Sequence, residues 1–327
     1  MTPPITIRRR TLMTLAAGAL LGGTAPAQGA FPSKPITLVQ GFNAGGNADV
    51  IARIVATALA RELGQPVNVE PRPGAGGNLA SGQVARAPAD GHTLILLTGG
   101  HAVSAALYKQ LAFEPLEGFD WLSVVSTFPF VLATSAESRF KSVTDVLAAA
   151  KAAPGSISYS SVGIGSTQHL SGELFQSLAG VQLNHIPYKG GAAPLQDVLG
   201  GRVDLMFDSV TVTRAQIEAG KLRGLGVTGT TRAPQLPAVP SIADSVPGYE
   251  VTSWTGIAAP RGLPPAVAQQ LHAAIVKVLA QPEVVRSLEA TGGVVSPSAS
   301  GAAMKAFVGG QIAKWTDVVK KAGIPQQ

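Results

Sequence analysis

Cysteine is absent from the 327-residue chain, which excludes disulfides, thiolate metal sites and a cysteine nucleophile. Charged residues make up only 13% of the sequence and aromatic residues 5%, so groups for acid–base chemistry are scarce. No basic stretch interleaved with aromatic residues occurs, which argues against nucleic acid as a partner. The five histidines show no metal-ligand spacing. We therefore expect no cofactor, no metal site and no catalytic residue.

The sequence also lacks a membrane-spanning apolar run, although a short one stands near its start. Arg8-Arg9-Arg10 is followed by an apolar stretch ending at Leu20-Leu21 and by the small residues Ala25-Pro26-Ala27. This order is typical of a secretory signal peptide, and the run is about half the length of a spanning helix. We expect cleavage after Ala27, with Gly29 or Ala30 as alternatives, and an exported, soluble monomer in the periplasm. Losing three arginines lowers the formal charge from +6 to +3 (6 − 3).

Short β-branched runs alternate with helical patterns along the remainder of the chain, which is typical of βαβ units around mainly parallel sheets. The length predicts two domains. Strands are predicted at 36–39, 67–70, 93–97, 130–133, 157–160, 203–207 and 222–227. Helices are predicted from Asn47, as a capping residue, and at 143–152, 167–178, 195–199, 265–279 and 302–321.

Two glycine-rich loops each join a predicted strand to a predicted helix, one at Gly41–Asn47 and one at Ser161–Thr167. Glycine lets the backbone approach a ligand closely, and the free N–H groups of a helix start attract anions. Facing each other across a cleft, the loops would hold a carboxylate without an arginine clamp, with the Ser166 amide as one donor. Either loop alone would more often be purely structural, because glycine-rich βα loops are common in α/β proteins.

Three further residues have two interpretations each. Asp208, at the end of an apolar strand, either faces the cleft or forms a turn. His169, in the turn after the second loop, is better explained by helix capping or wall-lining than by catalysis. Asp49 and Arg53 have the spacing of an ion pair on a helix surface.

The sequence resembles the Bug family of periplasmic receptors, the substrate-binding components of tripartite tricarboxylate transporters. The resemblance runs along nearly the whole mature chain. Its motifs, in order, are Phe31-Pro32-Ser33-Lys34-Pro35-Ile36, Gly45-Gly46 through Asp49, Arg72-Pro73-Gly74-Ala75-Gly76-Gly77-Asn78, Leu107-Tyr108, Gly163 through His169-Leu170, Pro187-Tyr188-Lys189-Gly190-Gly191, Gly200-Gly201-Arg202-Val203-Asp204, Gly220-Lys221-Leu222-Arg223 and Pro247-Gly248-Tyr249-Glu250.

The resemblance implies an α/β protein with the type II periplasmic-binding fold, in which two lobes joined by two crossovers close on the ligand. Residues 28–129 and 255–327 would form lobe 1 and residues 130–254 lobe 2, with hinges near Phe128–Val131 and Glu250–Thr255. It implies a small carboxylate ligand (a di- or tricarboxylate, an acidic amino acid or an aromatic acid) and membrane transporter subunits as partners.

Carried over position by position, the resemblance implies a ligand site formed by Phe42, Asn43, Ala44, Asn47, Thr98, Ser161, Gly163, Ser166, Thr167 and Asp208. Gly45 and Gly165 of the two loops complete the candidate site. The family often has Pro-Phe at Gly41-Phe42, threonine at Ala48 and an apolar residue at Asn43. These departures all fall in the first loop, where they bear on the identity of the ligand.

Two other functions remain open. The protein could present its bound acid to a signalling membrane protein instead of a transporter, or it could be an enzyme on the same two-lobed scaffold. A hydrolase would need a paired nucleophile and base, and the sequence offers neither: Tyr159 stands where a nucleophile elbow around Ser161 needs glycine.

Overall fold

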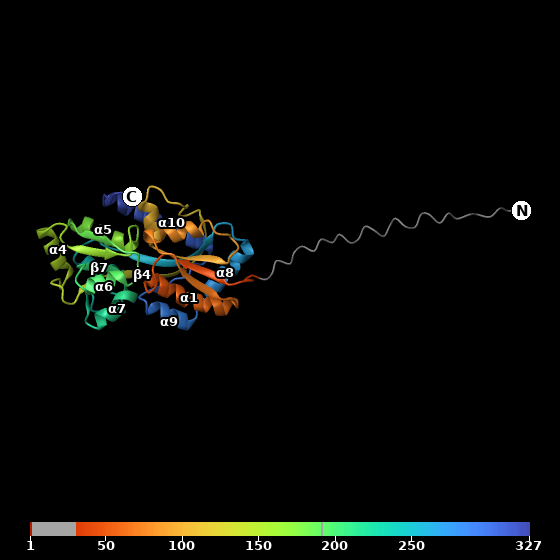
Figure 1. The fold of residues 1–327 in the computed structure, drawn as a ribbon, viewed down its shortest axis with the longest axis horizontal. Coiled ribbons are helices and arrows are strands. Elements are labelled where there is room, and N and C mark those ends of the chain that lie inside the picture. The colour runs from red at the N-terminus through yellow and green to blue at the C-terminus, as the bar shows by residue number, and fades with distance from the viewer. Residues whose placement is uncertain (2–30, 191) are drawn as a thin grey trace.

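The computed structural model describes Met1, residues 31–190 and residues 192–327 (Figure 1). Apart from Met1, the predicted signal peptide of residues 1–27 lies outside the described residues. Within the described part of the chain, no helix has the length and apolar character needed to cross a membrane.

In the first sheet, the main strand order is β2 (Val67–Pro71), β1 (Ile36–Gln40), β3 (Thr93–Thr98), β9 (Thr252–Pro260) and the first part of β4 (Phe119–Ser135). β1 is parallel to β2 and β3, whereas β9 is antiparallel to β3 and β4. The short strand β10 (Val294–Val295) pairs with β4. Its helices are α1 (Asn47–Leu63), α2 (Asn78–Val84), α3 (Gly100–Leu107), α8 (Pro265–Leu279), α9 (Pro282–Glu289) and α10 (Gly301–Lys321), with a 3₁₀ turn, η1, at Ala75–Gly77. Figure 1 shows α1 and α9 on one side of this sheet and α10 on the other.

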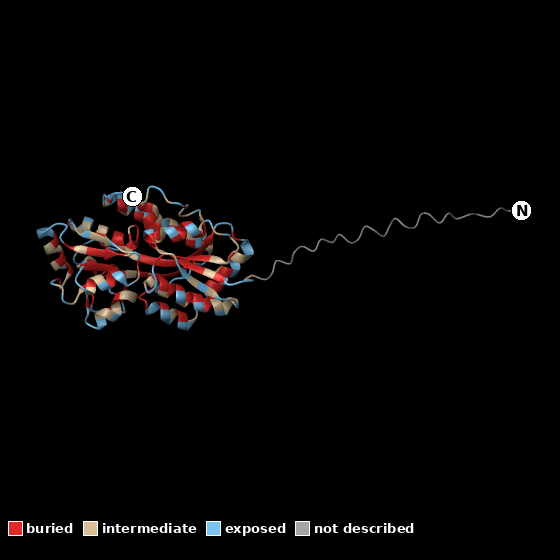
Figure 2. Ribbon diagram, viewed as in Figure 1, coloured by how far each residue is buried: buried red, intermediate tan, exposed pale blue. Residues whose placement is uncertain are grey.

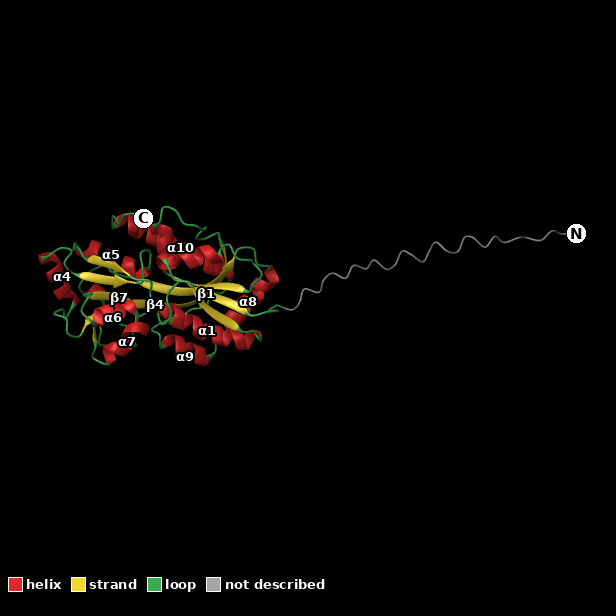
Figure 3. Cartoon of the chain, in the orientation of Figure 1, coloured by secondary structure: helices red, strands yellow, loops and turns green. Residues whose placement is uncertain are grey.

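The second sheet has the order β6 (Asn184–Pro187), β5 (Ser158–Ser161), β7 (Leu205–Ser209), the second part of β4, and β8 (Leu222–Val227). β5 is parallel to β6 and β7, and β4 is antiparallel to β7 and β8. The helices of this half are α4 (Val143–Ala152), α5 (Thr167–Ala179), α6 (Ala193–Leu199) and α7 (Val210–Glu218), followed by the 3₁₀ turn η2 (Ile242–Asp244). The alternation of strands and helices is thus confirmed (Figure 3). The expectation of mainly parallel sheets is wrong: among the described residues, four strand pairs are parallel and five are antiparallel, because β4 and β9 run against their neighbours.

One strand of 17 residues, β4, belongs to both sheets. Its residues up to Pro129 pair with β9, and its residues from Phe130 onward pair with β7 and β8. β9 begins at Thr252, so three residues before position 255 already pair with β4. The chain therefore passes between the two halves near Pro129 and again just before Thr252, while the lobe boundaries at 129/130 and 254/255 stay predictions.

The strands form the centre of the core, as the buried residues in Figure 2 show. In the second half of β4, Leu132 packs into the large core that both halves share, whereas Val131 and Ala133 pack into a smaller core on the opposite face. Side chains of a strand alternate between faces, so this part of β4 is covered on both sides.

The predicted capping role of Asn47 is wrong. Gly46 is the N-cap of α1, and no side chain caps this helix in the described structure. Asn47 is the first helical residue, and its side-chain oxygen accepts a hydrogen bond from Thr211 at 2.5 Å. The backbone amides at the start of α1 are consequently left for other partners.

Candidate functional site

Four strands end at one cleft between the two halves of the molecule. Phe42 follows β1, Thr98 ends β3, Val162 follows β5, and Asp208 lies near the end of β7. Each strand leads into a helix, α1, α3, α5 or α7, so four helix N-termini lie on this side of the sheets. Ligand sites in open α/β sheets lie beyond the carboxyl ends of strands. The cleft contains about 480 Å³ free of protein atoms, part of it open to solvent.

Five of the twelve residues predicted from the sequence line this cleft: Phe42, Asn47, Thr98, Thr167 and Asp208. The other seven lie in or beside the same loops without lining it, and their role as ligand-binding residues stays a prediction: Asn43, Ala44, Gly45, Ser161, Gly163, Gly165 and Ser166. Eight lining residues were not predicted: Gly46, Ala48, Phe128, Phe130, Val162, Gln168, Gly190 and Ser253.

The first loop is fixed by hydrogen bonds that use several of its own amides. Phe42 N–H donates to the Gln40 side-chain oxygen at 2.8 Å, and Asn43 N–H donates to the Lys189 carbonyl at 3.2 Å. Gly45 N–H donates to Asp49 at 3.2 Å. Gly46, Asn47 and Ala48, at the start of the uncapped helix α1, line the cleft, and the first amides of a helix have no intrahelical partner.

The predicted ion pair between Asp49 and Arg53 forms, with Arg53 Nε 2.9 Å from the Asp49 carboxylate. It is more than a surface pair, because the Asp49 side chain is only 6% exposed. Asp49 joins the Gly45 amide to Arg53 and so holds the first loop against α1.

The second loop has an internal hydrogen bond that the sequence did not predict. The Ser166 amide donates to the Gly163 carbonyl at 3.1 Å, so it is occupied within the loop and is not a free donor for a ligand. The Ser166 hydroxyl donates to the same carbonyl at 2.6 Å and accepts from His169 N–H at 3.2 Å, which caps α5. Thr167 and Gln168, the first two helical residues, line the cleft. Their amides, in the first turn of α5, have no intrahelical partner.

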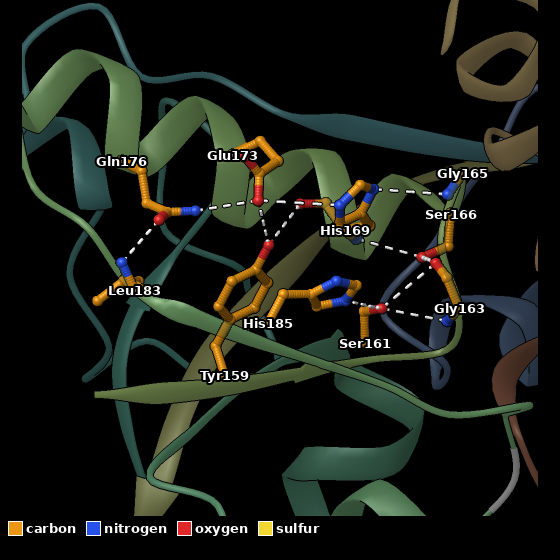
Figure 4. A network of polar contacts seen from close by, with 10 residues as sticks. All are labelled: Tyr159, Ser161, Gly163, Gly165, Ser166, His169, Glu173, Gln176, Leu183 and His185. Carbon is orange, nitrogen blue, oxygen red and sulfur yellow. Dashed lines mark hydrogen bonds and ion pairs between the residues drawn. The ribbon is translucent and has the colours of Figure 1, made fainter. Parts of the chain in front are cut away.

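A buried polar network supports the second loop from behind (Figure 4). The His185 ring stacks on His169, with centroids 4.3 Å apart, and its Nε2 lies 2.7 Å from the Ser161 hydroxyl. The Tyr159 hydroxyl donates to Glu173 at 2.7 Å. Burial lowers the pKa of both His169 and His185 to about 4, so the stacked rings are neutral at physiological pH.

His169 is a loop-supporting residue in this arrangement. Its Nδ1 accepts from Gly165 N–H at 3.5 Å, and its ring does not line the cleft. Among the described residues, no group of three or more His, Asp or Glu side chains lies together as potential metal ligands.

Of the described residues that line the cleft, Asp208 alone carries an ionisable side chain. The residue is 4% exposed, and burial raises the pKa of its carboxyl to about 6. Asp208 lines the cleft, as one of its two interpretations had it. It lies within β7 and not in a turn, and its carboxylate accepts a hydrogen bond from the following Ser209 N–H at 2.7 Å.

Contacts across the cleft hold the two halves together. The Ser104 hydroxyl on α3 donates to the Gly165 carbonyl at 3.2 Å, and the Tyr108 hydroxyl lies 3.4 Å from the Ile164 carbonyl. Gly76, with φ of 63°, packs so closely that a Cβ built on it would lie 2.6 Å from Ile164 O. The second loop therefore touches the first half through backbone atoms along its length.

With this geometry established, sequence comparison identifies the family. Residues 51–324 match the family described as "Tripartite tricarboxylate transporter family receptor". The chain belongs to this family. The protein BugT of Bordetella pertussis is 33% identical over 299 residues, which cover 90% of this chain and 90% of that protein. The resemblance to Bug proteins that the sequence motifs carried is therefore confirmed.

Solved structures of relatives share the fold. An R. palustris protein solved with adipate is 35% identical, with a TM-score of 0.86 over 91% of this chain and 100% of that one. MatC from Rhodopseudomonas palustris, solved with bound malate, is 31% identical, with a TM-score of 0.83 over 88% of this chain and 100% of that one. The chain accordingly has the α/β periplasmic-binding fold with two lobes.

Proposed function

We propose that this protein is a periplasmic solute-binding protein that captures a small carboxylate between its lobes and delivers it to the membrane subunits of a tripartite tricarboxylate-type transporter. The observation that carries the proposal is the pair of helix starts, α1 and α5, whose first residues line one cleft from opposite halves of the chain. Open amides and the helix dipole favour an anion at each of them.

Apart from Asp208, the described lining is uncharged, which agrees with this mode of capture. Asn47, Thr98, Thr167, Gln168 and Ser253 offer neutral donors, and no lysine or arginine is among the described lining residues. A carboxylate would thus be held by amides, hydroxyls and dipoles instead of by an ion pair. The relatives solved with adipate and with malate support a carboxylate as the ligand class.

The relatives' role favours transport over the two alternatives, presentation of the bound acid to a signalling protein and catalysis. For the enzyme alternative, the Ser161–His185 contact is the only nucleophile-like pair near the cleft among the described residues. It belongs to the buried network behind the second loop, and neither side chain lines the cleft. We assign the pair to support of the loop.

The test is a thermal-shift panel followed by identification of the natural ligand. At about 100 times the dissociation constant, a ligand stabilises by about 2.7 kcal/mol, which moves a melting curve by several degrees. Mono- and dicarboxylates should shift the melting temperature, and sugars and purely cationic amines should not. Mass spectrometry of the protein purified from its native host should find a small organic acid. A shift with neutral sugars and none across a broad acid panel would contradict the proposal.

A further inference from the structure

One oxygen of the Asp208 carboxyl is left for a ligand. Oδ1 accepts from Ser209 N–H at 2.7 Å and lies 3.4 Å from the Ser209 hydroxyl. Oδ2 has no hydrogen-bond partner among the described residues. It is also not among the described side-chain atoms that are both unpartnered and fully buried, so it keeps some exposed surface. Asp208 as a whole is only 4% exposed, and it lines the cleft. A ligand would therefore reach Oδ2 from the cleft.

Asp208 Oδ2 requires a hydrogen-bond donor on the ligand, whereas the rest of the lining does not. The neutral lining side chains and the helix amides can donate hydrogen bonds to an acid, but an ionised carboxylate only accepts. A carboxylate ligand placed against Asp208 would bring together two like charges in a largely dehydrated space. A ligand that puts a hydroxyl or ammonium group there instead gives Oδ2 the donor it lacks.

We propose that Asp208 is a specificity-determining residue whose Oδ2 accepts a hydrogen bond from the ligand, so that the preferred acid carries a hydroxyl or ammonium group close to its carboxylate. This inference rests on the proposed function, since it selects among the carboxylates that the cleft would hold. The helix starts of α1 and α5 bind the carboxylate end, and Asp208, on β7, reads the substituent.

No ionisable neighbour takes over the role of the ligand's donor. The elements packed against β7 are β4, β5, α5, α6 and α7. Their titratable or charged groups are Asp120, Tyr159, His169, Glu173, Asp197, Arg214 and Glu218. None of them contributes to the raised pKa of Asp208, which results from burial and is partly offset by the hydrogen bonds from Ser209.

Calorimetric titration of matched acids tests the inference. Each set keeps one carbon skeleton and changes one substituent: succinate, malate and aspartate; adipate, 2-hydroxyadipate and 2-aminoadipate; phenylacetate, mandelate and phenylglycine. In the set whose skeleton fits, the hydroxy or amino acid should bind roughly 10- to 100-fold tighter than the unsubstituted acid, the range for a hydrogen bond to a charged group.

Two outcomes separate the failure of this inference from the failure of the proposed function. If unsubstituted acids bind as tightly as their substituted partners, Asp208 does not select, although carboxylate capture stands. If no acid in any set binds, both proposals are overturned.

Asp208→Asn should reduce the preference for substituted acids to within about threefold, because the charge that strengthens the hydrogen bond is gone. Asp244→Asn is the matched control, since Asp244 is exposed on η2 and outside the cleft. It should keep the preference of the unmodified protein. Equal preference in the Asp208→Asn and Asp244→Asn variants would overturn the inference.

Proton exchange provides a readout that needs no variant. Near pH 6, about half of the free protein carries a proton on Asp208, whose pKa is about 6. A ligand that donates to Oδ2 favours the ionised carboxyl, so binding should release up to about half a proton, measured by calorimetry in buffers of different ionisation enthalpy. Proton uptake would mean that a protonated Asp208 donates to the ligand, which would overturn the inference.

Discussion

The Thr211 hydroxyl at the start of α7 donates a hydrogen bond to the Asn47 side chain at the start of α1, at a distance of 2.5 Å. The two residues are 164 positions apart in the sequence, and Asn47 lines the cleft. This bond joins two helix N-termini from opposite halves of the protein. This arrangement of the two halves is therefore stabilised by the protein's own contacts as well as by any ligand that the halves enclose.

Thr211→Val should weaken ligand binding by roughly 2- to 10-fold. A neutral hydrogen bond contributes about 0.5–1.5 kcal/mol, and this one is made only when the two helix starts are together. Thr57→Val is the matched control, because Thr57 is an exposed residue of α1 that bonds only to its own helix at Arg53. Calorimetric affinity for a confirmed acid is the measurement, and equal effects of both changes would contradict a role in closure.

Gly76→Ala should impair closure through a steric clash. The added Cβ would lie 2.6 Å from Ile164 O in the opposite half, which is closer than real Cβ contacts come. We expect at least about tenfold weaker binding, measured by calorimetry, together with a wider protein in small-angle scattering at saturating ligand.

Gly64→Ala is the control that separates the steric clash from backbone strain. Gly64 has a similar φ of 67° but no heavy atom within 4 Å of an added Cβ. Gly64→Ala carries the same left-handed strain of about 1–2 kcal/mol and should lower the melting temperature without changing affinity. Weaker binding in both variants would assign the effect to strain.

Thr167→Pro should weaken carboxylate binding by roughly 10- to 100-fold, the range for a hydrogen bond to a charged group. Proline removes the Thr167 amide and is tolerated at the first position of a helix; this chain itself begins α8 and α9 with Pro265 and Pro282. Thr167→Val removes the hydroxyl but keeps the amide, so it should weaken binding by less than about fivefold. Equal affinities of the two variants would exclude the amide as a ligand donor.

Asp208→Asn should stabilise the protein at neutral pH. The pKa of an unfolded aspartate is about 4 and that of folded Asp208 is about 6, so between these values the folded protein binds more protons. Its stability therefore falls as the pH rises from about 4 to about 6, by up to about 3 kcal/mol from this group. Urea unfolding should be measured from pH 4 to pH 8. The free energy of unfolding of the variant should rise relative to that of the unmodified protein between about pH 4 and about pH 6. A difference that stays constant with pH would contradict the prediction.

Local sequence signals predict the outer helices well. The helices at 143–152 and 265–279 have the bounds that the sequence suggested, because each carries an uninterrupted apolar stripe with a polar opposite face. Helix α3 was not predicted, since nearly all of its residues are buried and no polar face marks its period. The first part of β4 was also missed: buried Ser123 and Ser126 interrupt its apolar pattern.

The candidate site was predictable where glycine marks a strand-to-helix loop. Phe128, Phe130 and Ser253 could not be found in that way, because they reach the cleft from the strands that cross between the halves. Nor does composition show which amides remain open. Whether Ser166 or Thr167 offers its N–H depends on how the loop turns, and here the turn places the Gly163 carbonyl against Ser166.

The change of pairing partner divides the continuous strand β4 into two parts of unequal length. Its partner change at Pro129 and Phe130 leaves ten residues on one side and five on the other, or about 33 Å and about 17 Å of extended chain. A bend of about 15° there would displace the far ends by roughly 9 Å and 4 Å. Proline at position 129 has no N–H to lose, so this displacement would cost few ladder bonds. A rotation confined to a few backbone angles at the two crossings, near Pro129 and just before Thr252, would thus move the rims of the cleft apart while both sheets stay intact.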